Sequence, residues 1–363
     1  MQTPENTVSD DLARPGRGAQ SNASGRYEAQ RRSFESDGWD RDDPACVLRT
    51  EVRDERPRRI LSYNRSPDLP FDRSVNPYRG CEHGCIYCFA RPSHAWLGLS
   101  PGLDFESRLV ARPGAAACLA RELARPGYRV APVAIGTNTD PYQPVERERG
   151  ITRACLEVLS AFNHPVALVT KGSLIERDID LLADMARRGL VRVGISVTTL
   201  DAQVARRMEP RVPPPARRLS TIAALAEAGV PVRIMTSPVI PGLTCHEIEA
   251  LLEAGRDAGA TAASWVMLRL PLEVAPLFRE WLSVQYPDRA GRVMGLVRDM
   301  HGGRDYAADW GRRMRGSGPY AQMIAQRFDR AARRLGLVQK TLPLNCDLFA
   351  VPPRAGEQLS LFG

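Results

Sequence analysis

Residues 80–89 read Gly80-Cys81-Glu82-His83-Gly84-Cys85-Ile86-Tyr87-Cys88-Phe89, so three cysteines fall within eight positions. Soft thiolates in proteins select iron-sulfur clusters or zinc. The spacing CxxxCxxC offers three thiolates to three irons of one cubane cluster and leaves the fourth iron open. Glycines before and within the loop, and an aromatic residue between the last two cysteines, favour a cluster whose open iron receives a substrate. The alternative is a structural zinc site completed by His83 or by a distant cysteine.

Strand and helix patterns alternate after these cysteines. Short β-rich apolar runs favour strands at residues 130–136, 166–170, 191–197, 230–235 and 264–268. Amphipathic patterns favour helices at residues 115–123, 152–160, 175–188, 215–228 and 245–258. Such alternation with short connections predicts parallel βαβ units. With a first strand placed just before Cys81, we expect six units, fewer than the eight of a closed barrel. The predicted fold class is α/β, a partial (β/α)6 TIM-type barrel.

The pattern also divides the chain into four parts. Residues 1–56 are expected to be a flexible N-terminal tail, because the first 45 residues are rich in Arg, Ser, Gly and Asp and poor in aliphatic residues. Residues 57–271 form the barrel with its cluster loop. Beyond Pro271 the strand pattern disappears, and helical patterns at 276–285, 291–301 and 319–335 predict a helical extension over residues 272–342. Residues 343–363 read as a C-terminal loop and tail.

Composition narrows the class of protein. The chain has 363 residues, a net charge of +8 and 43% hydrophobic residues, enough for a sizeable core. No apolar run approaches the length of a membrane span, and the N-terminus lacks the apolar region of a signal peptide, so we expect a cytoplasmic protein with no membrane partner. The eight cysteines are too sparse for a disulfide scaffold. Residues 269–340 carry fourteen Arg or Lys against seven Asp or Glu, a basic excess that suits a phosphate-rich partner or is simply solvated.

CxxxCxxC with an aromatic residue before the last cysteine, followed by six βα units, resembles the radical S-adenosylmethionine (SAM) superfamily over roughly residues 75–271. The resemblance implies that Cys81, Cys85 and Cys88 hold a [4Fe-4S] cluster. It also implies that SAM chelates the open iron and is cleaved reductively to a 5′-deoxyadenosyl radical, with an electron donor such as flavodoxin or ferredoxin.

The strand ends resemble those of the spore photoproduct lyase group within that superfamily. The similar positions are residues 136–141, 169–171 and 194–197, which end three successive strands. In a parallel barrel these ends form one face, where ligands bind. By this similarity Thr139, Lys171 and Ser196 would hold SAM, with Lys171 as a charge partner for its carboxylate. Further candidates for the SAM site are Tyr87, Asn138 and Arg211.

One departure from the lyase concerns its hydrogen donor. The lyase has a cysteine at the end of its second strand, where this chain has Gly136 or Thr137, so the chain looks more like a lyase-related subfamily without an assigned reaction. Cys245, after the fifth strand, and Cys346, in the C-terminal loop, are candidate hydrogen donors, although a free cysteine is by default a small buried hydrophobe. We expect segments 89–105 and 343–353 to shield the barrel mouth from water.

The predicted function is a radical SAM enzyme related to DNA repair or nucleic-acid modification. The C-terminal Gln358-Leu359-Ser360-Leu361-Phe362 resembles the pentapeptide with which bacterial repair proteins dock on the DNA sliding clamp, or it folds back on the barrel. Two alternatives remain open. One is a radical SAM enzyme that acts on a protein or a small metabolite, and the other is a non-catalytic iron-sulfur factor associated with DNA.

Overall fold

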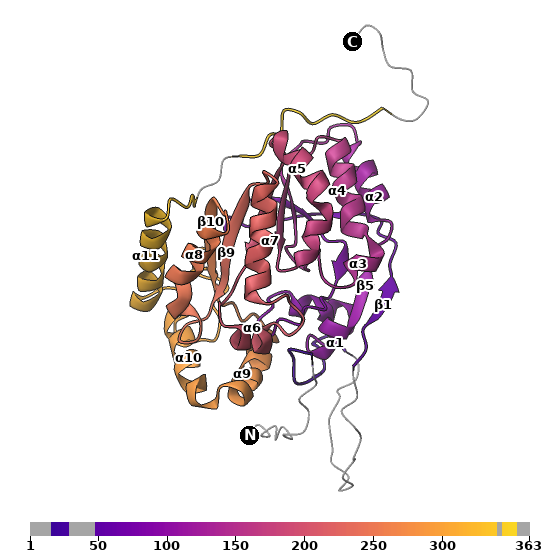
Figure 1. The fold of residues 1–363 in the computed structure, drawn as a ribbon. Coiled ribbons are helices and arrows are strands. Elements are labelled where there is room, and N and C mark those ends of the chain that lie inside the picture. Colours follow the sequence, from indigo (N-terminus) through magenta and orange to yellow (C-terminus); the bar gives the residue numbers. More distant parts are fainter. Residues whose placement is uncertain (1–15, 29–47, 340–342, 354–363) are drawn as a thin grey trace.

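The computed structural model describes residues 16–28, 48–339 and 343–353. Its centre is a seven-stranded sheet in the order β10-β9-β8-β7-β6-β3-β2 (Figure 1). Six strands run parallel, and β2 pairs antiparallel with β3. The sheet is open, with β10 and β2 as its edges, which confirms the expected partial (β/α)6 arrangement. The strands are β2 (Leu61–Tyr63), β3 (Arg73–Val75), β6 (Val133–Ile135), β7 (Val166–Thr170), β8 (Val191–Ser196), β9 (Val232–Val239) and β10 (Ala262–Met267).

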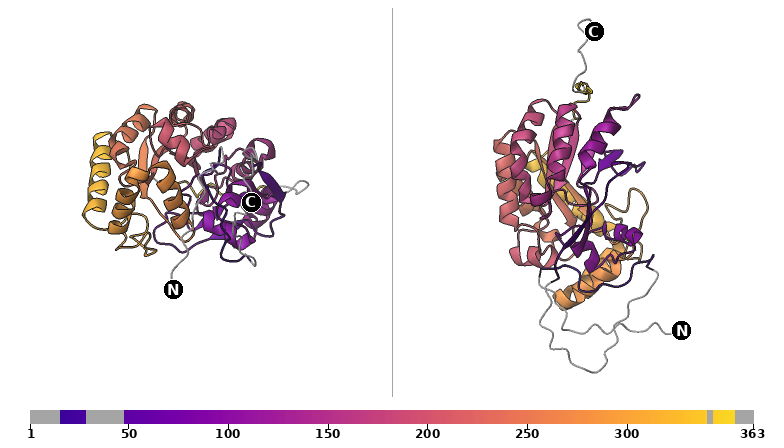
Figure 2. Two further views of the ribbon diagram at one scale, coloured as in Figure 1. Left: turned by 90° about the horizontal axis from the view of Figure 1, so that it is seen from below. Right: turned by 90° about the vertical axis from the view of Figure 1, so that its right-hand side faces the viewer.

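Helices connect successive parallel strands and pack in an arc against the sheet (Figure 2). They use the amphipathic segments that the sequence predicts, and their apolar faces bury Leu156, Leu182 and Leu252 in the main core. Two predicted helices each begin with a separate 3-10 turn. The helices are α2 (Ala115–Leu123), α3 (Glu146–Arg149), α4 (Ile151–Ala161), η2 (Ser173–Asp178), α5 (Ile179–Arg187), α6 (Ala202–Met208), α7 (Pro215–Glu227), η3 (Cys245–Glu247) and α8 (Ile248–Asp257).

A second, three-stranded sheet has the order β1-β5-β4 and was not expected from the sequence. Its strands are short and carry Arg and Glu, so they lack the long apolar runs from which strands are predicted. Two of them flank the cysteine loop, which lies between β4 and η1. The elements of this region are β1 (Glu51–Asp54), β4 (Tyr78–Arg79), η1 (Arg91–Leu97), α1 (Leu103–Ser107) and β5 (Arg108–Ala111).

The chain after β10 is helical, as predicted, with α9 (Val274–Gln285), α10 (Pro287–Met300) and α11 (Pro319–Arg334). The connection between α10 and α11 reaches across to the β2–β3 loop. There the Gly311 N–H donates to Asp68 Oδ1 at 2.8 Å, and Arg313 Nε lies 2.6 Å from Asp68 Oδ2. This contact joins the two edges of the open sheet.

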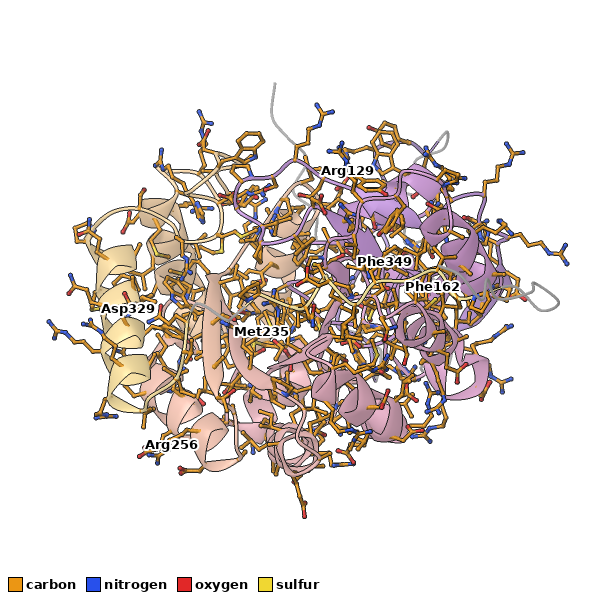
Figure 3. All side chains as sticks on the ribbon, turned by 90° about the horizontal axis from the view of Figure 1, so that it is seen from above. Arg129, Phe162, Met235, Arg256, Asp329 and Phe349 are labelled. Atoms are coloured by element: carbon orange, nitrogen blue, oxygen red, sulfur yellow. The ribbon has the colours of Figure 1, made fainter. Side chains whose placement is uncertain are left out.

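Residues 343–353 cross the amino ends of the strands, at the top in Figure 1. The Asn345 N–H donates to Gly189 O just before β8, and the Ala350 N–H donates to Phe162 O before β7. Phe349 packs against the rings of Phe162, His164 and Tyr128, with the first of these labelled beside it in Figure 3. The expectation that this segment shields the barrel mouth was therefore wrong, because the segment closes the opposite end of the sheet.

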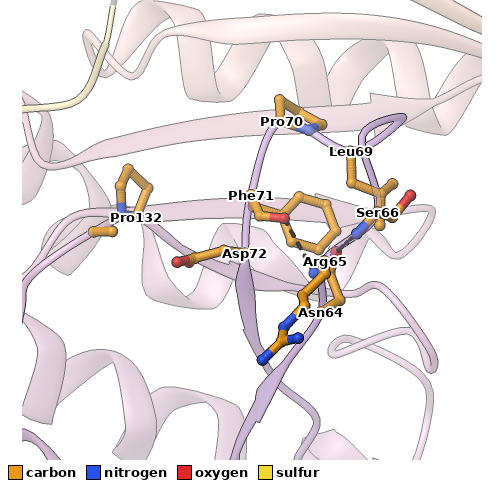
Figure 4. A pocket seen from close by; sticks show the side chains of 9 residues that line it. Asn64, Arg65, Ser66, Leu69, Pro70, Phe71, Asp72 and Pro132 are labelled. Atoms are coloured by element: carbon orange, nitrogen blue, oxygen red, sulfur yellow. Dashed lines mark hydrogen bonds between the residues drawn. The ribbon is translucent and has the colours of Figure 1, made fainter.

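A hollow of about 380 Å³ opens beside the β2–β3 loop (Figure 4). Asn64 shapes this loop, since its side chain donates to Phe71 O at 3.1 Å and accepts from the Ser66 N–H at 3.0 Å. Ala131 and Pro132, which precede β6, form the opposite wall. The hollow therefore belongs to the amino end of the sheet and lies apart from the cysteine loop.

The N-terminal region departs from the expected flexible tail. Residues 16–28 pack against the cysteine loop, with Arg17, Gly18 and Ala19 buried, and residues 51–54 form β1. Composition misled the prediction because this segment is held by hydrogen bonds more than by apolar burial. Residues 1–15 and 29–47, and the pentapeptide at 358–362, lie outside the described residues. Across the described ranges, no helix has the length and apolar character needed to cross a membrane.

Replacing Phe349 by alanine tests the C-terminal segment. We expect Phe349→Ala to lower the free energy of unfolding by about 2 kcal/mol, because it empties a half-buried ring site against three aromatic residues. Leu348→Ala is the matched control, since Leu348 is 43% exposed. Urea denaturation followed by circular dichroism measures both variants, and equal losses would contradict the packing described.

Candidate active site at the carboxyl end of the sheet

The cysteine loop lies at the carboxyl end of the parallel strands, where parallel α/β sheets bind ligands. Cys81 and Cys85 are buried, and Cys88 is partly buried. All three are free cysteines. Backbone hydrogen bonds fix the loop, from the Cys81 N–H to Phe105 O and from the Ile86 N–H to Met208 O. The structure therefore brings the three sequence-predicted thiols into one sheltered loop.

Burial raises the pKa of the Cys81, Cys85 and Cys88 thiols. For Cys85 the nearby charge of Glu209 raises the pKa further, and the charge of Lys171 opposes this effect. Thiolates in such a place need a positive partner, and iron supplies one. Three buried soft donors of this kind fit an iron-sulfur cluster.

His83 has a partner other than the thiols. Its Nδ1 lies 3.3 Å from Asp140 Oδ2, at ion-pair distance. The zinc alternative completed by His83 finds no support in this contact, because Nδ1 faces Asp140.

Asp140, just beyond β6, ties two strand ends together. It accepts hydrogen bonds from Thr170 Oγ1 at 2.5 Å and from the Lys171 N–H at 2.8 Å, both at the end of β7. Burial alone would raise the pKa of Asp140, but the charge of His83 and these hydrogen bonds hold it below its usual value. The carboxylate therefore sets the backbone from which the Lys171 side chain projects.

Lys171 lies among acceptors from the two strands that follow it in the sheet. Its Nζ is 2.8 Å from Ser196 Oγ on β8 and 3.3 Å from Ser237 O on β9. The ammonium also lies 5.6 Å from the centre of the Tyr87 ring, in the cysteine loop. The structure thus brings together three of the predicted SAM-site residues, Tyr87, Lys171 and Ser196.

Glu209 is a fully buried carboxylate that sequence reasoning missed. It forms ion pairs with Arg218 and with Lys171, the latter at 3.2 Å, and accepts hydrogen bonds from Tyr87 and Thr198. Burial alone would raise the pKa of Glu209, but Arg218 and Lys171 hold it well below its usual value. Burial and this negative charge raise the pKa of Tyr87, so its hydroxyl stays protonated as a donor.

Several buried hydroxyls at the same end of the sheet have no hydrogen-bond partner among the described residues. Thr139 follows β6, and Ser237 and Ser264 lie on β9 and β10, near the strand ends that hold Lys171. Thr236 is adjacent to Ser237 in β9, so it points to the opposite face, as does Ile234, which contacts Gly255 of α8. Buried polar groups without partners are rare in folded proteins and indicate a polar ligand or water. The oxygens are Thr139 Oγ1, Thr236 Oγ1, Ser237 Oγ and Ser264 Oγ.

The other predicted site residues have partners other than Lys171. The Asn138 N–H donates to Asn76 Oδ1 at the end of β6, and Arg211 lies 3.4 Å from Glu82 of the cysteine loop. Cys245 packs with the main core, where its Sγ is 3.2 Å from Tyr320 Oη of α11. Cys346 lies in the segment that crosses the amino ends of the strands, so the structure does not bring it to the cysteine loop.

Gly136, one of the two candidate positions for the lyase cysteine, leaves no room for a side chain. Its φ is +93°, and a Cβ there would lie 1.9 Å from Val169 O of the neighbouring strand. No side chain fits without moving β7, so a cysteine is excluded at this position.

Glu209→Gln tests the buried charge network. The substitution leaves Arg218 buried without its charge partner, and we expect a loss of about 3–5 kcal/mol in the free energy of unfolding at pH 7. The control is Glu176→Gln, which breaks the more exposed pair with Arg217 and should cost less than about 1 kcal/mol. Urea titrations measure both.

The same variant has a pH signature. Because the folded-state pKa of Glu209 is lowered, its stabilisation is complete above the ordinary glutamate pKa of about 4.3 and is lost as the pH falls toward the folded-state value. Below about pH 4 the difference in stability between wild type and Glu209→Gln should therefore narrow. A difference that stays constant on acidification would contradict the assignment.

Comparison with known proteins agrees with this geometry. Residues 75–255 match the family model of the radical SAM superfamily. An uncharacterized protein of Mycobacterium tuberculosis strain H37Rv is 39% identical over 232 residues, which cover 63% of this chain and 68% of that protein. An uncharacterized protein of Methanocaldococcus jannaschii is 23% identical over 214 residues, or 59% of this chain and 76% of that protein.

Among solved structures, spore photoproduct lyase with bound AdoMet and dinucleoside spore photoproduct aligns with a TM-score of 0.55 and 13% identity, over 79% of this chain and 80% of that chain. Another structure of the lyase, complexed with dinucleoside spore photoproduct, gives a TM-score of 0.54 and 15% identity over 79% and 81% of the two chains. At this identity the likeness shows a shared fold. The chain belongs to the radical SAM superfamily and is an enzyme of that class.

Proposed function

We propose that Cys81, Cys85 and Cys88 hold a [4Fe-4S] cluster and that SAM binds beside it. When bound, the cluster and SAM supply one-electron cleavage of the SAM C5′–S bond to methionine and a 5′-deoxyadenosyl radical. The observation that carries this proposal is that two buried thiols and one partly buried thiol, Lys171 and hydroxyls without partners share the carboxyl end of one sheet.

The chain's own residues bind and orient SAM in this proposal. Lys171 offers its ammonium group to the carboxylate of SAM. The ammonium group is positioned by the hydroxyls of Ser196 and Thr198 and by Glu209. Thr139 and Ser237 offer free hydroxyl oxygens on either side of it in the sheet. Tyr87 is fixed by its bond to Glu209, so its ring keeps one orientation beside the thiols. Asn138 borders the same strand end.

Water exclusion is supported by the packing around the thiols. Ala90 and Phe105 pack with Cys81, while Ile86 and Tyr87 pack with Cys85. A primary carbon radical reacts unproductively in open solvent, so a dry site is a requirement for the chemistry. The burial of Ala90, Ala95 and Phe105 supports a role of segment 89–105 as cover for the site.

We infer that the substrate is a nucleic acid or one of its bases. Phe89, directly after Cys88, is 44% exposed, and the Arg269 guanidinium lies 4.6 Å from its ring centre. Arg269 follows the end of β10, and Tyr306 Oη is 3.5 Å from it. Exposed aromatic rings beside arginine are the groups on which single-stranded bases stack. The spore photoproduct lyase, which shares this fold, has been solved with a dinucleoside, and that observation supports the same class here.

Formation of 5′-deoxyadenosine tests the chemistry. Anaerobically reconstituted protein with SAM and dithionite should yield the nucleoside, detected by liquid chromatography, and Cys85→Ala should abolish it because one of three iron ligands is gone. Cys155→Ala is the matched control, since Cys155 is buried in the main core. Wild-type protein that binds iron and releases no 5′-deoxyadenosine would favour a non-catalytic iron-sulfur factor.

Binding of a labelled single-stranded oligonucleotide tests the substrate class. Phe89→Ala and Arg269→Ala should each weaken binding by about tenfold, as expected for the loss of one stacked base or one phosphate contact. Arg256→Ala on α8 is the control, because Arg256 pairs only with the adjacent Asp257 among the ion pairs found. Fluorescence anisotropy measures affinity, and failure of the wild type to bind at any salt concentration would favour a protein or small-metabolite substrate.

A further inference from the structure

Arg91 and Glu106 form an ion pair beneath the cysteine loop, and both side chains are completely buried. The Arg91 guanidinium also donates to Gly84 O at 3.2 Å and to Cys85 O at 2.9 Å, in the middle of the CxxxCxxC motif. Its remaining donors bind the carbonyls of Pro101 and Gly102. Because every N–H of the planar Arg91 guanidinium is hydrogen-bonded, the guanidinium fixes the positions of these carbonyl groups. A lysine has no such planar set of donors and could not replace it.

The other side of Glu106 is held by the N-terminal segment. The Gly18 N–H donates to Glu106 Oε2 at 2.9 Å, and the Ala19 N–H donates to Oε1 at 2.8 Å. Arg17 adds a bond from Nη1 to Glu106 O at 2.6 Å. We call residues 16–28 the N-terminal strap, because they cross the cysteine loop at this carboxylate.

The strap touches the cysteine loop at van der Waals distance. A Cβ at Gly18 would lie 1.8 Å from Gly84 O, and a Cβ at Gly84 would lie 2.7 Å from Glu106 Oε2. Gly18 is required for this approach because the atom it faces belongs to the backbone and cannot rotate away. Gly84 is favoured because its φ is +66° and a Cβ there would meet the buried Glu106 carboxylate. Ala19 packs with Cys85 and Tyr87 in one apolar cluster. The strap therefore packs directly on the part of the loop that carries the middle cysteine.

The strap also connects the cysteine loop with the helical extension. Asn22 exchanges two hydrogen bonds with Asp104 of α1, each at 3.0 Å. Ser21 Oγ donates to Glu280 Oε2 at 2.7 Å, and Arg26 pairs with Glu273 next to α9. Polar contacts to α1 and to α9 therefore hold the strap in place, although the strap buries little apolar surface.

We propose that Arg17, Gly18 and Ala19, acting through Glu106 and Arg91, are positioning residues for the iron-sulfur cluster. This inference rests on the proposed function. The strap keeps the Gly84 and Cys85 carbonyls in the conformation that aims the Cys85 thiol, and it seals that thiol from solvent. A scaffold role alone would affect folding of the chain, whereas a positioning role affects the retention and the electronic environment of the cluster.

Gly18→Ala tests the inference in the full-length protein, with Gly295→Ala as control because a Cβ at Gly295 meets open space on α10. We expect Gly18→Ala to lose iron to a chelator about tenfold faster than wild type, the size of effect seen when outer-shell partners of metal ligands are changed. The electron paramagnetic resonance signal of the reduced cluster should shift or broaden. The unfolding midpoint of the iron-free protein should stay close to that of Gly295→Ala.

Arg17→Ala provides a second test of the strap, in case Gly18→Ala fails to fold. It removes the bonds from Arg17 to Glu106 O, Leu48 O and Thr50 Oγ1 and leaves the buried Arg91–Glu106 pair intact, so iron loss should again accelerate. Iron retention and a resonance signal equal to wild type in both variants would overturn the inference. Wild-type protein that takes up no cluster would instead overturn the proposed function, so the two failures are distinguishable.

Discussion

The site depends on a buried carboxylate that is stable only in contact with its charge partners. Glu209 is fully buried, and it joins Lys171 from β7, Arg218 from α7 and Tyr87 from the cysteine loop. A buried carboxylate is tolerated only when it is paired and hydrogen-bonded, and the buried Arg218 guanidinium needs its charge partner in the same way. The four groups therefore fix one another. Within the trio of charges one positive charge is left over, which is an electrostatic setting suited to an anionic group beside the thiols.

Much of this arrangement follows from the sequence through geometry. Apolar runs predict the strands, and parallel strands present their carboxyl ends at one edge of the sheet. Lys171 and Ser196 lie at the carboxyl ends of neighbouring strands, so their contact could be expected. Glu209 could not be found in this way, because it lies beyond α6 and reaches Arg218 only through the path of the intervening loop. Its signal in the sequence is an acidic residue beside several prolines, which is not specific. Hydrophobic periodicity likewise does not predict that the C-terminal segment crosses the amino ends of the strands, where it places Cys346.

The two terminal segments close opposite ends of the sheet by different physical means. At the amino ends, Phe349 packs on aromatic rings, and the contact depends on apolar area. At the carboxyl end, the strap is fixed by N–H groups that donate to a buried carboxylate. Composition-based reasoning counts apolar residues, so it assigned the glycine-rich strap to a flexible tail. Hydrogen bonds to a buried charge are directional. Next to a site whose atoms must keep fixed positions, the geometry of these bonds matters more than the area of apolar surface that is buried.

The open sheet adds a constraint on how a substrate reaches the site. The edges β10 and β2 do not pair, and Asp68 joins them by contacts to Gly311 and Arg313. This bridge lies near the carboxyl end of β10, where the Met267 N–H donates to Met314 O. Arg269, which contacts the Phe89 ring, follows the same end of β10 and lies close enough for its charge to act on Asp68. The nucleic acid that we propose as substrate would therefore meet Phe89 and Arg269 next to this bridge. The strap packs directly against the cysteine loop, whereas Phe89 is exposed, so the proposed substrate would approach the thiols beside Phe89.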